Sequence, residues 1–127
     1  MKKEYEEQYH RLEENHWWFR GRRDIVRSLV VGVAPDRSCR ILEMGCSGGP
    51  LIRELQADGF ANITGIDISP DAIELCKKRG LLDVHVMDAQ KLSFTDGHFD
   101  VITASDVLEH LSNPSEALRE WSLRGPQ

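Results

Sequence analysis

The sequence predicts an α/β fold with a parallel sheet, and three observations lead to this prediction. Short apolar runs typical of strands alternate along the chain with segments of helical periodicity. Three of these runs end at an acid, namely Glu43, Asp67 and Asp88. The first acid is followed by a loop of small residues, 45–49, and then by Pro50. Because parallel strands bring their carboxyl ends to one edge of a sheet, these groups should surround one crevice.

The composition is that of a small globular protein. The chain has 127 residues, of which 40% are hydrophobic and 29% charged. A net charge of −5, with acids and bases intermixed, argues against nucleic acid as the main partner. No apolar run approaches the ~18 residues of a membrane span. The three cysteines have no CxxC spacing and are interpreted as reduced thiols. We therefore expect a cytoplasmic protein with no membrane partner.

Two helices are expected before the first strand. Residues 3–15 have Tyr and Leu side chains at helical spacing, and a second helix should pass through Ile25 and end near Gly32. The segment 16–23, HWWFRGRR, lies between them and contains three consecutive aromatic residues. We expect residues 1–37 to form an N-terminal lid or cap, and residues 38–127 to form the ligand-binding domain.

The aromatic segment has two possible roles. It could be a hydrophobic clamp that fixes the N-terminal helix to the domain. It could also be a lid over the ligand, in which the faces of Trp17 and Trp18 stack on a ring or a cation and Arg22 contributes to the substrate site. Both roles can hold together, and the sequence leaves them open.

The central stretch, Arg40–Leu55, predicts a strand, a tight turn and a helix. Glycine in the 45–49 loop permits positive φ angles and close backbone approach. Pro50 suits the first turn of a helix, where its missing N–H costs nothing. The free N–H groups and the positive dipole end of that helix can bind an anion. This helix should therefore begin at the ligand.

The rest of the chain repeats this pattern. Further strands are expected at 61–66, 84–87 and 99–104. The helix after the second strand should begin at the N-cap Ser69, followed by Pro70, and end near Gly80. A last helix should open at 113–116, where Asn, Pro and Glu have the spacing of a capping box.

Two classes of ligand fit a Gly-rich turn followed by an acid about 20 residues later. A dinucleotide motif starting at Gly45 would need glycine at the positions of Ser47 and Pro50. The acids Glu43 and Asp88 would also repel a diphosphate. S-adenosylmethionine (SAM) fits better, because its carboxylate suits the helix N-terminus and its ammonium and sulfonium charges suit an acid-lined pocket.

Four segments in order resemble the class I SAM-dependent methyltransferases. ILEMGCSGG (41–49) is similar to their motif I, with Ser47 in place of the middle glycine, and GIDIS (65–69) to the ribose-binding strand end. MDAQKLSF (87–94) is similar to the adenine-binding segment, and residues 99–118 to the motif after strand four. HWWFRGRR also resembles a segment of some bacterial and archaeal members.

The resemblance implies a Rossmann-like three-layer αβα fold with strand order 3-2-1-4. Family members usually have seven strands, and this chain is expected to be truncated before strands 5–7. Strand four would then be an open apolar edge, and such an edge invites pairing with another chain. We therefore expect a homo-oligomer that covers this edge.

The resemblance also implies roles for individual residues. Gly45 and its neighbours would hold the amino-acid end of SAM, with Glu43 near the ammonium group. Asp67 would bind the ribose hydroxyls, and Ile68 would pack on the adenine. The implied cofactor-binding residues are Glu43, Gly45, Cys46, Ser47, Gly49, Asp67, Ile68, Asp88, Ala89 and Ser105.

Methyl transfer is an in-line displacement at carbon, so positioning can supply most of the catalysis. His110 is the candidate base, and no metal is expected. A weaker alternative is a metal site, because Asp106, Glu109 and His110 have helical i, i+3, i+4 spacing. The sequence thus predicts a methyltransferase that acts on an unidentified small molecule and releases S-adenosylhomocysteine (SAH). A non-catalytic SAM-binding module is the alternative, and an NAD-type dehydrogenase domain is less favoured.

Overall fold

The computed structural model describes residues 2–104, 107 and 111–126. Its strands are β1 (Arg40–Met44), β2 (Asn62–Asp67), β3 (Val84–Val86) and β4 (Val101–Thr103). Its helices are α1 (Lys3–Asn15), α2 (Trp17–Val33), α3 (Pro50–Ala57), α4 (Pro70–Lys78) and α5 (Pro114–Arg124). All strand pairs are parallel, and the order is β3-β2-β1-β4. The predicted α/β class and strand order are confirmed.

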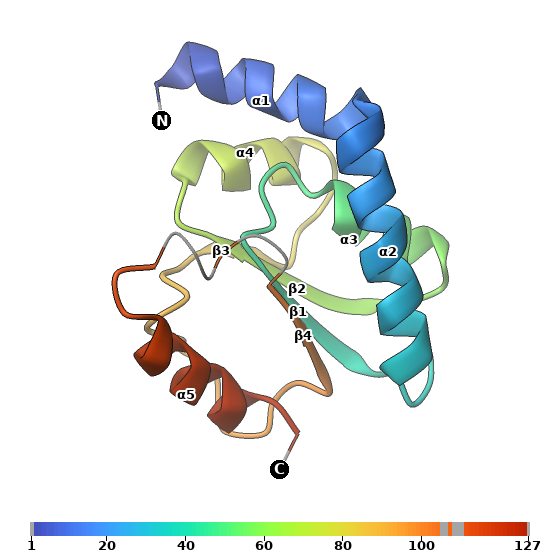
Figure 1. Ribbon diagram of the computed structural model, residues 1–127, viewed down its shortest axis with the longest axis vertical. Helices are drawn as coiled ribbons and strands as arrows, with labels where there is room; N and C mark the ends of the chain where they lie inside the picture. Colours follow the sequence, from blue (N-terminus) through green and yellow to red (C-terminus); the bar gives the residue numbers. More distant parts are fainter. Residues whose placement is uncertain (1, 105–106, 108–110, 127) are drawn as a thin grey trace.

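Helices cover both faces of the sheet, and successive side chains of β1 pack into two different core clusters. Ile41 packs in a cluster with side chains from α2, α3 and α4, such as Val30. Leu42 and Met44 pack in a second cluster, which Trp121 of α5 closes. Figure 1 shows α2, α3 and α4 on one side of the strands and α5 on the other. Because all the strand pairs are parallel, every strand's carboxyl end lies at one edge of the sheet.

The N-terminal helices form part of the same body. Val30 of α2 is buried in the core cluster that contains Ile41 of β1. Arg27 of α2 forms a two-pronged ion pair with Asp58, at 2.8 and 2.9 Å. The segment 1–37 therefore packs directly on the sheet domain, and the boundary after residue 37 stays a prediction.

Several element boundaries differ from the sequence prediction, and β2 lies one residue later than expected. The aromatic segment is not a connection but the start of α2, because His16 caps this helix through a 3.3 Å hydrogen bond from the Trp18 N–H. β3 is one residue shorter than expected. β4 begins only at Val101, because the N–H of Phe99 donates to the Arg124 carbonyl (2.9 Å) at the end of α5.

Among the described strands, β4 lies at one edge of the sheet, next to β1. An assembly through this edge stays a prediction. None of the helices in the described part of the chain is both long enough and apolar enough to cross a membrane.

Both the backbone conformation and the packing at position 49 require glycine. Its φ is +83°, and an added Cβ would lie 2.3 Å from the Leu81 side chain, which is buried. Gly80 has a similar φ of +86° but open space around it. The left-handed conformation costs a residue with a Cβ about 1–2 kcal/mol, and overpacking typically adds about 1–3 kcal/mol.

We therefore expect Gly49→Ala to lower the free energy of unfolding by about 2–5 kcal/mol, and Gly80→Ala by only about 1–2 kcal/mol. Urea denaturation of the two variants measures the difference, with Gly80→Ala as the control for backbone strain alone. Equal losses would show that the contact with Leu81 relaxes at no cost.

Candidate functional site

A cavity of about 970 Å³ lies at the carboxyl ends of β1, β2 and β3, where α1 and α2 provide further lining. It receives most of the predicted cofactor residues. Those that line it are Glu43, Gly45, Cys46, Ser47, Asp67, Ile68, Asp88 and Ala89. Gly49 does not line it, but its positive φ allows the turn from the Gly-rich loop into α3. Ser105, Asp106, Glu109 and His110 lie outside the described residues.

A second cavity, of about 830 Å³, lies at the opposite end of the strands. Its lining includes Arg40, Asn62, Asp83 and Asp100, which come from the amino ends of the strands or from the loops before them. The Gly-rich loop and the acids that follow the strands lie at the other cavity. The first cavity is therefore the candidate site.

The Gly-rich loop is organised by Asp67. One oxygen of this carboxylate accepts the N–H of Ser47 (2.9 Å), and the other accepts the N–H of Ser69 (2.9 Å). Ser47 has a φ of +54°, in the region that favours glycine. Each carboxylate oxygen can accept a second hydrogen bond. Asp67 can therefore hold the loop and still accept hydroxyl groups of a ligand.

The start of α3 is free to bind an anion. Its N-cap is Gly49, so no side chain caps the helix, and its first turn contains no acid. The first N–H groups of such a helix lack partners within it. Together with the helix dipole they favour a carboxylate or another anion at this end of the cavity.

Glu43 is a buried carboxyl group at the end of β1. It is 4% exposed and accepts a hydrogen bond from the hydroxyl of Thr103. Burial raises the pKa of Glu43 to about 8, and the nearby charges of Glu13 and Asp67 contribute to this increase. A cation placed in the cavity beside Glu43 would favour its ionised form.

The other end of the cavity combines an apolar and a polar wall. Ile68 is 69% exposed although it lines the cavity, so its side chain is available to an apolar ligand ring. The carboxylate of Asp88 accepts the N–H of Gln90 (2.9 Å). The indole N–H of Trp121 donates to the Ala89 carbonyl (2.9 Å), so α5 fixes this segment.

The aromatic segment reaches the cavity through residues other than the two tryptophans. Trp17 is 75% exposed, Trp18 is 46% exposed, and neither lines the cavity. Phe19 does line it, and its ring packs edge-on against Tyr9 of α1 at 5.6 Å. Arg22 also lines it while lying over the Trp18 ring, 4.8 Å from the centroid.

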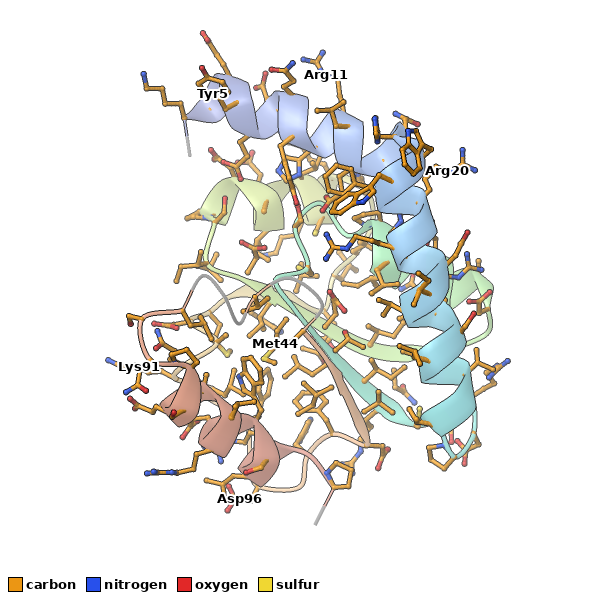
Figure 2. All side chains as sticks on the ribbon, viewed as in Figure 1. Tyr5, Arg11, Arg20, Met44, Lys91 and Asp96 are labelled. Atoms are coloured by element: carbon orange, nitrogen blue, oxygen red, sulfur yellow. The ribbon has the colours of Figure 1, made fainter. Side chains whose placement is uncertain are left out.

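Sequence reasoning missed the contribution of α1. Glu6, His10 and Glu13 line the cavity, and their spacing of four and three residues places them on one helix face. Figure 2 shows Tyr5 and Arg11 on the opposite, outer side of α1. A hydrogen bond to Glu13, with the charges of Glu13 and Glu6, raises the pKa of His10. The helical spacing of these three polar residues was the feature of the sequence that could have predicted a polar inner face of α1.

Among the described residues, no group of three or more His, Cys, Asp and Glu side chains is arranged to hold a metal ion. The predicted metal alternative, Asp106, Glu109 and His110, lies outside that part of the chain.

The chain matches known methyltransferases in sequence. A family model described as a methyltransferase domain matches residues 42–122. The mitochondrial ubiquinone biosynthesis O-methyltransferase of Saccharomyces cerevisiae is 32% identical over 112 residues, which are 83% of this chain and 36% of that protein. The ubiquinone biosynthesis O-methyltransferase of Dechloromonas aromatica is 36% identical over 85 residues, 62% of this chain and 36% of that protein. The chain thus spans about a third of the length of these curated relatives.

Solved structures show the same fold. A putative SAM-dependent methyltransferase of Methanococcus maripaludis superposes with a TM-score of 0.84 at 14% identity, over 96% of this chain and 58% of that one. The cyclase SpnF superposes with a TM-score of 0.72 at 29% identity, over 81% of this chain and 41% of that one. With this fold and a methyltransferase-domain match over residues 42–122, the chain belongs to the class I SAM-dependent methyltransferase family.

Proposed function

We propose that the cavity binds SAM and that the protein transfers the methyl group of SAM to an oxygen atom of a small molecule. One observation carries this proposal. The Gly-rich loop and the acids at or just after the ends of three neighbouring strands, Glu43, Asp67 and Asp88, line a single cavity. The family membership and the ubiquinone biosynthesis O-methyltransferase relatives support it.

The residues fit SAM at both ends. The uncapped start of α3 suits the carboxylate of its amino acid, and buried Glu43 suits the neighbouring ammonium group. Asp67 has lone pairs free for the two ribose hydroxyls. Ile68 can pack on the adenine, while Asp88 accepts a hydrogen bond from its amino group.

Bound SAM would supply a methyl group on a positively charged sulfur. A nucleophile can attack the carbon of this group and displace the sulfur, which leaves as the neutral thioether of SAH. The protein's own residues then have three tasks. The loop and Asp67 orient the cofactor, the acid-lined cavity stabilises its positive charges, and α1 with Phe19 excludes water. His110, from the segment similar to the motif after strand four, is proposed as the group that accepts the proton of the acceptor hydroxyl.

Titration calorimetry with SAH and with NADH tests the binding proposal. We expect the protein to bind SAH and not NADH. Binding of NADH with similar or higher affinity would overturn the assignment. A methyl-transfer assay with labelled SAM and a panel of phenols then separates an enzyme from the alternative, a non-catalytic SAM-binding module. The assay is needed because the related SpnF is named a cyclase.

A further inference from the structure

The inner face of α1 contacts the Gly-rich loop through His10. The Nδ1 atom of His10 lies 3.1 Å from the Ser47 hydroxyl and 3.8 Å from a carboxylate oxygen of Glu13. The side chains of His10 and Glu13 are only 9% and 14% exposed. His10 thus links Glu13 to the loop, and all three residues line the cavity.

The end of α1 is fixed by arginine contacts. Arg23 donates to the backbone carbonyls of Glu13 and Glu14. The Glu14 carboxylate forms ion pairs with Arg53 and with Arg79, the latter at 2.6 Å. Arg79 also donates to the Gly48 carbonyl of the loop (2.7 Å). α1 therefore has a defined position over the loop.

The cavity is acidic on both sides. On the α1 side lies Glu13, and on the sheet side lies Glu43, whose pKa the charge of Glu13 helps to raise. Arg23 bonds to the backbone of Glu13 rather than to its carboxylate, which lies 3.8 Å from the Nδ1 atom of His10. The Nε2 atom of His10 is buried and lies 3.5 Å from a carboxylate oxygen of Glu6, also on α1, without meeting the geometry of a hydrogen bond among the described residues. The α1 side of the cavity therefore presents two carboxylates, those of Glu6 and Glu13, on either side of His10.

We propose that Glu13 of α1 and Glu43 of β1 form a two-sided subsite for the ammonium group of the cofactor, with His10 as a positioning residue that holds Glu13 against the loop. This inference rests on the proposed function. An ammonium group has three N–H donors, and each charge-assisted bond that it makes is shorter and stronger than a neutral one. One acid on each side of the cavity would use two of these donors. The N-terminal helix would thereby contribute directly to cofactor affinity.

Two ligands test this subsite. SAH contains the ammonium group, whereas 5′-methylthioadenosine has the same adenosine and a thioether but no amino acid. We expect Glu13→Gln to weaken SAH binding roughly tenfold or more and to leave 5′-methylthioadenosine binding within about twofold. Titration calorimetry measures both affinities. Glu7→Gln, an exposed acid on the same helix, is the matched control and should change neither.

The outcomes separate this inference from the proposed function. If the unmodified protein fails to bind SAH, the proposed function itself is wrong. If it binds SAH but Glu13→Gln binds SAH equally well, the ammonium subsite is wrong, and the same holds if both ligands weaken equally. Should Glu13→Gln not fold, as judged by circular dichroism, Glu13→Asp moves the carboxylate by one methylene and must show the same selective loss.

Discussion

Replacing Asp67 with alanine is expected to reduce the affinity for SAH by at least about 100-fold. Hydrogen bonds to a charged group contribute about 1.5–3 kcal/mol each, and the two proposed ribose contacts would both be lost. The N–H groups of Ser47 and Ser69 would also lose their acceptors, so the loop would become less ordered. Titration calorimetry at one pH and salt concentration gives the change in affinity.

Asp24→Ala is the matched control for Asp67→Ala. The side chain of Asp24 is 70% exposed, lies on α2 and pairs with Arg27 at 3.2 Å. Its removal should leave the SAH affinity unchanged. An Asp67→Ala protein that folds and binds SAH as tightly as the unmodified one would refute the ribose contact.

Replacing Glu43 with glutamine is expected to change how stability depends on pH. Glu43 has a folded-state pKa of about 8 against an ordinary value of 4.5, so the folded protein holds the proton more tightly than the unfolded chain. The stability that this proton provides is fully present below pH 4.5 and is lost as the pH rises through 8. The total loss is up to about 5 kcal/mol, since one pKa unit corresponds to about 1.4 kcal/mol.

Without ligand, raising the pH from 4 to above 8 should therefore destabilise the unmodified protein more than Glu43→Gln. The free energy of unfolding of Glu43→Gln, minus that of the unmodified protein, should rise over this range. Urea denaturation across this range measures the effect, and the difference between the two proteins removes the contribution of other titrating groups. Glu74→Gln is the control, because this side chain is 63% exposed. Parallel stability curves for Glu43→Gln and the unmodified protein would contradict the raised pKa.

The sheet could be predicted well because its residues obey simple burial rules. The apolar residues of β1 are buried on both faces, as expected for a central parallel strand, and the acid at its end reaches the cavity. The strand order followed from the family resemblance. The start of β4 could not be predicted, because it depends on a hydrogen bond between Phe99 and the distant Arg124.

The orientation of α1 could not be predicted from hydrophobic periodicity. Its apolar residues Tyr5 and Leu12 are 66% and 46% exposed, whereas Glu6 and His10 are buried. Of the apolar residues in this pattern, Tyr9 lines the cavity, whereas Tyr5 and Leu12 lie largely outside it. The inner face is polar and lines the cavity, and functional surfaces are where such departures from the usual pattern are expected.

The consecutive aromatic residues illustrate a second limit. Successive residues of an α-helix point about 100° apart, so only some of residues 17–19 can face the cavity. Phe19 does so, while Trp17 and Trp18 remain outside it. Which of them faces inward depends on where α2 begins, and that is set by the His16 cap.

The ion pairs of Glu14 have a kinetic consequence. They hold α1 across the cavity, so cofactor exchange that displaces this helix must first break the pairs with Arg53 and Arg79. The three side chains are 20–41% exposed, and dissolved ions therefore screen their attraction. Under the proposed function, release of SAH should accelerate as ionic strength rises, and the N-terminal helix as well as the site would then set how long SAH stays bound.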